Sequence, residues 1–73
     1  MAEFSERLRE LRHKNGVTQK ALGMVIEVGP DSISVYESGK GYPEVRRLII
    51  IAEFFNVSLD YLVGRTDNPE INH

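Results

Sequence analysis

Apolar side chains recur at the three- and four-residue spacing of an α-helix along most of this chain. Near its start, Phe4, Leu8 and Leu11 share one face, which predicts an amphipathic helix over about residues 3–15. Charged residues, Arg7 among them, fill the positions between. Similar patterns predict further helices over about 19–26, 30–38, 43–56 and 59–63. No stretch alternates with the two-residue period of a strand, so we expect an all-α fold of five helices.

The second and third helices together have the pattern of a helix-turn-helix. Residues 19–38 carry apolar side chains in a bihelical register, at Leu22, Ile26, Val28, Ile33 and Tyr36. Val28 lies in the break between the two helices. Gly23 has no side chain, so the second helix of the pair can cross closely over the first. A plain helical hairpin buried in a bundle is the alternative that this spacing leaves open.

Local chemistry agrees with these helix boundaries. Thr18 is a suitable N-cap, and Pro30 suits the first position of the third helix, where its missing N–H is not needed. Ser38 and Gly39 close that helix with a residue that tolerates positive φ. Glu27 occupies the turn, where a left-handed backbone is expected at a cost of about 1 kcal/mol for a residue other than glycine.

The apolar faces of the helices predict the core. We expect these residues to be largely buried: Leu8, Leu11, Leu22, Ile26, Val28, Ile33, Leu48, Ala52, Phe55 and Leu62. Val45 also falls on the core face of the fourth helix. Ile50 and Phe54 fall on the opposite side, where a solvated helix would carry charged residues. They predict either a subunit interface or a surface covered by the fifth helix or the tail.

A chain of 73 residues suits one domain with a small core. We place this domain at residues 1–66 and assign residues 67–73 to a polar, frayed tail. The chain has no cysteine and two histidines, too few to build a metal site or a catalytic triad. We therefore expect no enzyme and no cofactor. No apolar run of membrane-spanning length and no secretory signal occurs, and we expect a soluble cytoplasmic protein without membrane contact.

Three segments resemble those of the phage repressor–Cro type helix-turn-helix family, also called the xenobiotic-response-element type. They are RLRELRHKNGVTQKALG, ISVYESGKGYP and LIIIAEFFNVSLDYLVGRT, and the resemblance covers residues 4–66. The match is specific because the TQ pair, the YE-x-G-K segment and the N-V-S-x-D-Y-L segment occur in order. The resemblance implies a compact five-helix repressor-like domain that binds operator DNA, usually as a two-fold dimer.

The resemblance also assigns roles at matching positions. It implies phosphate contacts from the start of the second helix and the loop after the third, at Gln19, Lys20, Ser38, Gly39, Lys40 and Gly41. It implies an ion pair between Arg12 and Glu37 that braces the fold rather than contacting DNA. In this family the C-terminal helix often pairs across the two-fold axis. Combined with the apolar side of the fourth helix, this gives a dimer interface of Ile50, Phe54, Tyr61 and Val63.

The outward face of the third helix departs from the family pattern. Its base-facing residues are Pro30, Asp31, Ser34 and Val35, where family members often carry Gln, Arg, Asn or Ser. The Asp31 carboxylate can accept a hydrogen bond from cytosine N4 but is repelled by phosphate, and Ser34 can bond either way. Pro30 and Val35 offer apolar contact to a thymine methyl group. Because direct readout is thin, discrimination between sequences is expected to depend on DNA shape.

The charge of the motif is low for a DNA-binding surface. The net charge of the chain is −2 at pH 7, whereas DNA-binding domains tend to be basic. From Thr18 to Arg47, four basic residues are balanced by four acidic ones. Because phosphate neutralisation supplies much of the affinity for DNA, a single domain should bind weakly and dimerisation should be needed.

Two classes of function are consistent with these features. The first is a sequence-specific transcription regulator, a repressor in its expected form, that binds double-stranded operator DNA as a homodimer. The second is a protein-interaction module on the same fold, of the antitoxin or anti-repressor type, which the acidic recognition surface favours. The sequence indicates no small-molecule effector.

Overall fold

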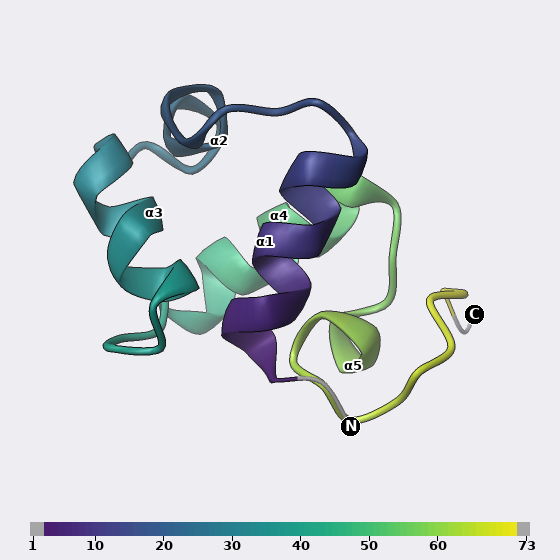
Figure 1. Cartoon of the computed structure of the whole chain (residues 1–73). Coiled ribbons are helices and arrows are strands. Elements are labelled where there is room, and N and C mark those ends of the chain that lie inside the picture. The colour runs from purple at the N-terminus through teal and green to yellow at the C-terminus, as the bar shows by residue number, and fades with distance from the viewer. Residues whose placement is uncertain (1–2, 72–73) are drawn as a thin grey trace.

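The computed structural model describes residues 3–71 (Figure 1). These residues form five α-helices and no strand, as the sequence predicts. The helices are α1 (Phe4–Lys14), α2 (Gln19–Ile26), α3 (Pro30–Glu37), α4 (Val45–Phe55) and α5 (Leu59–Leu62).

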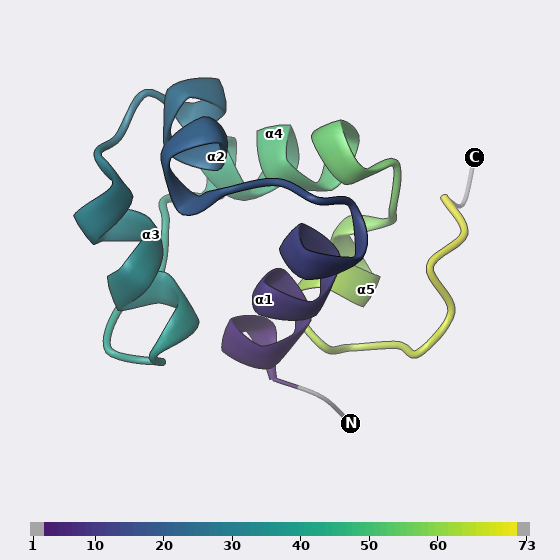
Figure 2. The same cartoon turned by 45° about the horizontal axis from the view of Figure 1, so that its top comes forward.

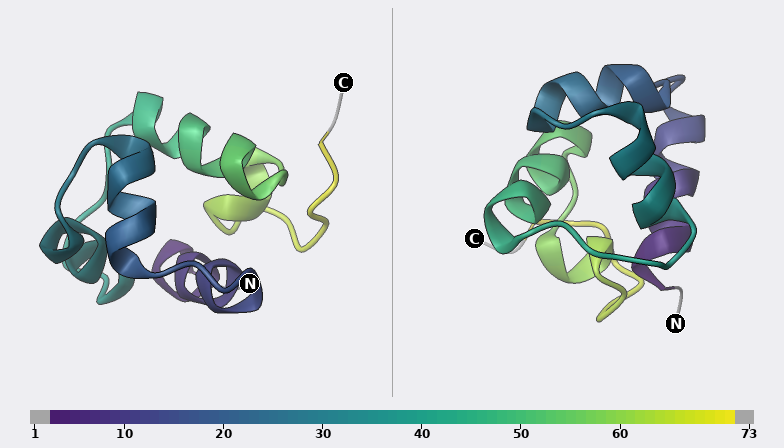
Figure 3. Two further views of the ribbon diagram at one scale, coloured as in Figure 1. Left: turned by 90° about the horizontal axis from the view of Figure 1, so that it is seen from above. Right: turned by 90° about the vertical axis from the view of Figure 1, so that its left-hand side faces the viewer.

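The helices are arranged so that α3 lies at one end of the domain. It packs against α1 and α2, while α4 packs against α2 and α5, and α5 also contacts α1. Figures 1 and 2 show α3 at the left-hand edge and α5 with the C-terminal segment on the opposite side. The right-hand view of Figure 3 looks onto this end, where α3 is in front of the other helices. The second helix of the motif is therefore accessible from outside.

The turn between α2 and α3 has the expected local structure. The Oγ1 atom of Thr18 accepts a hydrogen bond from the Ala21 N–H at 3.0 Å, which caps α2. Glu27 ends α2 in the left-handed conformation, with φ 61° and ψ 44°. A Cβ atom on Gly23 would lie 2.5 Å from the Val28 carbonyl oxygen. The close approach that requires glycine is therefore made by the backbone of the turn, not by α3 itself.

A single core joins all five helices. Its buried apolar residues are Phe4, Leu8, Leu11, Leu22, Ile26, Ile33, Ile51, Ala52, Val57 and Leu62. Seven of these belong to the predicted core. The other three predicted members, Val28, Leu48 and Phe55, pack against the core but are only partly buried. The expectation that they are largely buried is wrong: Val28 lies in the turn between α2 and α3, Phe55 is the last residue of α4, and Leu48 precedes the buried positions of that helix.

The first turn of α4 differs from the prediction. Pro43 is buried but precedes the helix, and Glu44 is extended with φ −64° and ψ 161°, so the helix begins at Val45. Val45 was expected on the core face and is 66% exposed. The fully buried positions of α4 are Ile51 and Ala52. The core therefore lies against the second half of this helix, and its first turn extends past the core.

The segment after α5 returns along the domain. Residues 67–71, which the sequence assigns to a polar tail, are all exposed. Two contacts nevertheless connect them to the domain: the Ser58 N–H donates to the Pro69 carbonyl at 2.9 Å, and Arg7 pairs with Asp67 at 3.1 Å. The end of the predicted tail, residues 72–73, lies outside the described residues. Among residues 3–71 there is no helix whose length and apolar character would let it span a membrane.

Candidate nucleic-acid interface

The outward face of α3 brings four of the predicted residues together. Pro30, Asp31, Ser34 and Val35 are all exposed, and they follow one another at one- and three-residue steps on the surface of a single helix. The opposite face carries Ile33, which is completely buried, and the largely buried Glu37. The face is therefore available to a macromolecule while its opposite side is fixed in the domain (Figure 3).

Arg12 and Glu37 form a two-bond ion pair that connects α1 to the end of α3. Arg12 Nε donates to Glu37 Oε2 at 2.6 Å and Nη2 donates to Oε1 at 3.0 Å. Arg12 Nη1 also donates to the Val17 carbonyl at 3.0 Å. The two side chains are only 12% and 6% exposed. A planar guanidinium opposite a carboxylate gives strong and directional bonds, so the pair fixes the position of α3 relative to α1.

The hydrogen bonds of Glu37 determine its ionisation. Burial alone would raise the pKa of this carboxyl group, but hydrogen bonds from Arg12 and Gln19, with attraction to Arg12 and His13, lower the pKa below its ordinary value of 4.5. The hydrogen bond to Glu37 likewise raises the pKa of Arg12. Both groups are therefore charged at neutral pH.

Gln19 is directed at the same carboxylate. Its Nε2 atom donates to Glu37 Oε1 at 3.3 Å, from the first position of α2. The side chain therefore connects α2 to α3. Its contact with a DNA phosphate stays a prediction.

Three hydrogen bonds in the loop after α3 share one carbonyl acceptor. The carbonyl oxygen of Val35 accepts from the Ser38 N–H, the Ser38 hydroxyl and the Lys40 N–H, at 3.3, 2.8 and 3.2 Å. Gly39 has φ +79°, and a Cβ atom on Gly41 would lie 3.1 Å from Val35 Cγ1. These contacts hold the loop in one shape and leave the Lys40 side chain exposed.

The same contacts limit which backbone groups can hold a phosphate. The Gly39 N–H, predicted to hold a phosphate, already donates to the Tyr36 carbonyl at 3.4 Å, a weak bond. The Lys40 N–H is directed at Val35. Within the loop, the exposed Lys40 side chain is thus the group best suited to meet an anion, since it is charged and solvent accessible.

Two cations in and near the motif have different surroundings. Lys20 is exposed at the first turn of α2. Arg47 has a structural role instead: its Nε donates to the Ile26 carbonyl at the end of α2 at 2.8 Å, and its Nη1 pairs with Glu44 at 2.6 Å. The sequence count of four cations therefore overstates the positive charge available to a partner.

The predicted dimer residues differ in exposure. Phe54 is 46% exposed, and its ring meets the edge of Phe55 with the centroids 5.0 Å apart. Ile50 is partly buried, packs against the core and lines a small hollow between α2 and α4, whereas the sequence places it on the side of α4 opposite the core. Tyr61 and Val63 are partly buried. Among the four, Phe54 offers the most accessible apolar surface.

Two residues with distinct environments were missed from the sequence. Arg7 is 5% exposed, although it was expected among the solvated residues of α1. Its spacing of three residues from Phe4 and four from Leu11 places it on the apolar stripe, which was an available signal. Tyr42 is 67% exposed in the loop after α3, where its ring lies 5.8 Å from that of Phe4.

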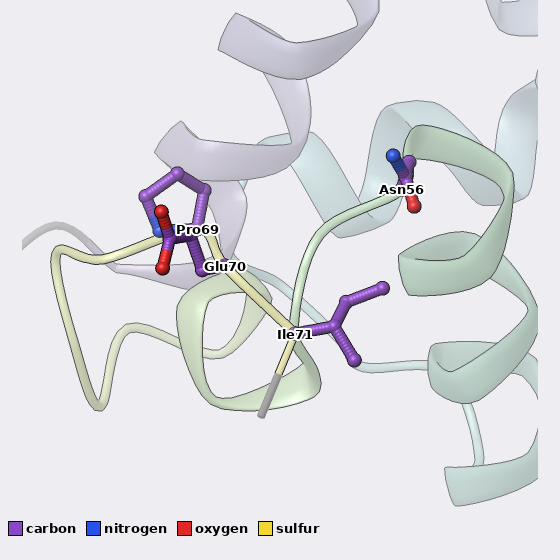
Figure 4. Close-up of a pocket in the computed structure, with 4 residues that line it drawn as sticks. All are labelled: Asn56, Pro69, Glu70 and Ile71. Carbon is purple, nitrogen blue, oxygen red and sulfur yellow. The ribbon is translucent and has the colours of Figure 1, made fainter. Parts of the chain in front are cut away.

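One of the hollows at the other end of the molecule lies beside the C-terminal segment. It has a volume of about 400 Å³ and is lined by Asn56, Pro69, Glu70 and Ile71 (Figure 4). These side chains supply one carboxylate and one amide, not a pair of acid and base groups. In the described part of the chain, no three His, Cys, Asp or Glu side chains are grouped to hold a metal ion.

Comparison with known proteins agrees with this geometry. The sequence model of the helix-turn-helix family matches residues 8–62, and the chain belongs to this family, in its phage repressor–Cro type. The chain is similar to the transcriptional activator BcrR of Enterococcus faecalis, with 43% identity over 62 residues that cover 85% of this chain and 30% of BcrR. It is also similar to the transcriptional regulator ImmR of Bacillus subtilis, with 36% identity over 69 residues that cover 94% of this chain and 54% of ImmR.

The fold is similar to that of the P22 c2 repressor, whose crystal structure contains the synthetic operator 9T. The TM-score is 0.83 at 29% identity, and the match covers 90% of this chain and 100% of the repressor chain. The chain thus spans one phage repressor domain but only 30% and 54% of the lengths of BcrR and ImmR.

Proposed function

We propose that this chain is a sequence-specific DNA-binding transcription regulator, a repressor that acts as a two-fold dimer on operator DNA. The observation that carries the proposal is the exposed face of α3, fixed from behind by the buried pair of Arg12 and Glu37. A helix held in this way can enter the major groove without reorganising. The similarity to named transcription regulators and to an operator-bound repressor supports it.

In this arrangement the base-facing residues are Pro30, Asp31, Ser34 and Val35. Phosphate contacts come from the start of α2 and the loop after α3, at Gln19, Lys20, Ser38, Gly39, Lys40 and Gly41, with the two lysines supplying the charge. Because a single carboxylate and a single hydroxyl group reach the bases, part of the specificity comes from the shape and deformability of the DNA.

Lys40→Ala tests the phosphate contacts. The variant is expected to weaken binding to all duplex sequences and to reduce the slope of log affinity against log salt concentration by about one unit, because one counterion fewer is released. Lys14→Ala, at the end of α1, is the matched control and should leave the slope unchanged. Fluorescence anisotropy over a range of salt concentrations measures both. Gln19→Ala is a less clear test because it also removes a hydrogen bond to Glu37.

The opposite result has a definite meaning. If no duplex binds, or if added salt leaves binding unchanged, the DNA-binding proposal fails. The protein-interaction function then takes its place, a function favoured by the exposed Asp31 in the first turn of α3 and by the balanced charge of the motif.

The dimer follows from the weakness of a single contact. One helix with little positive charge around it covers a half-site of a few base pairs, whereas a symmetric dimer presents two such helices about 34 Å apart, one turn of DNA. We place the interface at the C-terminal part of α4 and at α5, with Phe54, Tyr61 and Val63 and a smaller contribution from Ile50. Phe54 has the exposed ring that such an interface needs.

Phe54→Glu is expected to keep the helical fold, to shift sedimentation towards the monomer and to lower operator affinity at least about tenfold, because burial of a large apolar side chain contributes roughly 1.5–3 kcal/mol. Ile49→Glu is the matched control, since Ile49 is 43% exposed on a different side of α4. A Phe54→Glu variant that stays dimeric with full affinity would place the interface elsewhere.

A further inference from the structure

Arg7 is a buried cation that the DNA interface does not use. Its Nη1 atom donates to the carbonyl oxygens of Tyr61 and Thr66, at 3.2 and 3.1 Å. Its Nη2 atom donates to Asp67 Oδ1 at 3.1 Å. The guanidinium carbon lies 3.9 Å from the centroid of the Tyr61 ring, within the range of a cation–π contact. One side chain of α1 therefore contacts α5, the turn after it and the start of the C-terminal segment.

The contacts matter because α5 is very short. A helix of four residues is not stable without tertiary contacts. The carbonyl oxygens of Leu59 and Tyr61 accept hydrogen bonds from the N–H groups of Val63 and Gly64, and the Tyr61 oxygen accepts a further bond from Arg7. Arg7 supplies hydrogen-bond donors at this end, where a positive charge is also favoured by the helix dipole. The only buried side-chain polar atom without a partner in the described residues is Arg7 Nε. The position of the guanidinium group is therefore fixed by the hydrogen bonds of Nη1 and Nη2.

We propose that Arg7 is the positioning residue of α5 and of residues 64–67, and through them of the dimer face to which Tyr61 and Val63 belong. This inference rests on the proposed dimer. The planar fork of arginine contacts two carbonyl groups and a carboxylate together while stacking on a ring. A lysine ammonium group, a compact charge without this plane, cannot make the same set of contacts.

Arg7→Lys is the direct test because it keeps the charge and loses the fork. Amide hydrogen exchange is measured at Val63, Gly64 and Arg65, whose N–H groups bond within α5 and the following turn, and at Leu22 and Val28 in the helix-turn-helix as reference. Exchange in the α5 group is expected to rise about tenfold or more, with less than about a twofold change in the reference group, because the opening is local. The dissociation constant of the dimer should rise about tenfold as well.

Asp67→Asn is the control. The Asp67 side chain is 77% exposed, so its pairing with Arg7 is screened by water and the exchange rates should change less than about twofold. An Arg7→Lys variant with equal changes in both groups of amides, or with no change, overturns the proposal. So does an unchanged dissociation constant in a dimer whose α5 exchange has risen.

Two further outcomes remain decisive. If the wild-type chain is monomeric at all concentrations, the dimer of the proposed function fails, while local exchange at α5 still decides whether Arg7 positions this helix. If Arg7→Lys does not fold, Tyr61→Leu takes its place, because it removes the ring and keeps the carbonyl acceptor. An increase in exchange rate confined to the α5 amides then supports the proposal, and an equal increase in both groups of amides contradicts it.

Discussion

Replacing Arg12 by alanine is expected to destabilise the domain by about 3–5 kcal/mol, because the Glu37 carboxylate is left buried without its partner. The carboxylate is 6% exposed and receives two hydrogen bonds from the guanidinium group. Glu37→Ala should have a smaller effect, since Arg12 is somewhat more exposed and keeps its bond to the Val17 carbonyl. Urea denaturation followed by circular dichroism gives both free energies of unfolding.

The double variant separates the interaction energy of the Arg12–Glu37 pair from the other contacts of the two side chains. Arg12→Ala with Glu37→Ala should cost clearly less than the sum of the two single changes, because the expensive species is the lone buried charge. If the three values are strictly additive, the two side chains do not stabilise each other and the brace behind α3 is not an energetic one.

Because the pKa of Glu37 is lowered in the folded state, the stabilisation by the Arg12–Glu37 pair depends on pH. Because this pKa is lower in the folded than in the unfolded state, the unfolded state takes up the proton first as the pH falls. The stabilisation is thus fully present above the ordinary pKa of 4.5 and is lost progressively as the pH falls through the lower folded value. Glu37→Gln should show a shallower loss of stability in this acid range than the wild-type chain.

Leu22→Ala and Ile33→Ala are each expected to cost about 2–5 kcal/mol, a large part of the stability of a small domain. Both side chains are completely buried and belong to the two helices of the motif. Truncation removes apolar contacts and leaves a cavity that the surrounding helices cannot close. Met24→Ala is the matched control in α2, because Met24 is 73% exposed and its truncation should change stability by less than about 0.5 kcal/mol.

Thermal unfolding followed by circular dichroism measures these changes. If neither Leu22→Ala nor Ile33→Ala lowers the midpoint more than Met24→Ala does, the assignment of the core between α2 and α3 is wrong.

Much of the motif could be predicted because its causes are local. The hydroxyl of Thr18, the ring of Pro30 and the spacing of Leu22, Ile26 and Ile33 act within a few residues, and the helix boundaries follow from them. The left-handed conformation of Glu27 was expected for the same reason, since a tight turn between two helices needs it. The pairing of Arg12 with Glu37 came from the family resemblance, because nothing local connects residues 25 positions apart.

What could not be predicted depends on how the helices pack. The partners of Arg7 are more than 50 residues away along the chain, so its burial becomes apparent only when α1, α5 and the C-terminal segment are brought together. The apolar pattern of α4 predicts which side of the helix faces the core, but it does not predict where along the helix the core ends. The prediction that Val45 faces the core is therefore wrong. The partial burial of Ile50 beside α2 could not be predicted either, because the position of α2 next to α4 is a tertiary feature.

The predicted base-facing residues are exposed in the structure, whereas Gln19 and Gly41 among the predicted phosphate contacts are partly buried, and all contacts with DNA stay predictions. With Arg47 held by Ile26 and Glu44, the exposed cations between Thr18 and Arg47 are Lys20, Lys40 and Arg46. Affinity should therefore depend strongly on these few charges and on the second subunit.

Selection of bound duplexes from a random-sequence pool tests the claim that the outward face of α3 reads DNA. The wild-type chain is expected to enrich sites with two related half-sites about 10 base pairs apart, as a two-fold dimer requires. Asp31→Ala or Ser34→Ala should enrich different bases within the half-sites, while Lys40→Ala should enrich the same bases more weakly. Failure to enrich any sequence, or an Asp31→Ala, Ser34→Ala double variant that enriches the wild-type sites unchanged, would contradict the claim.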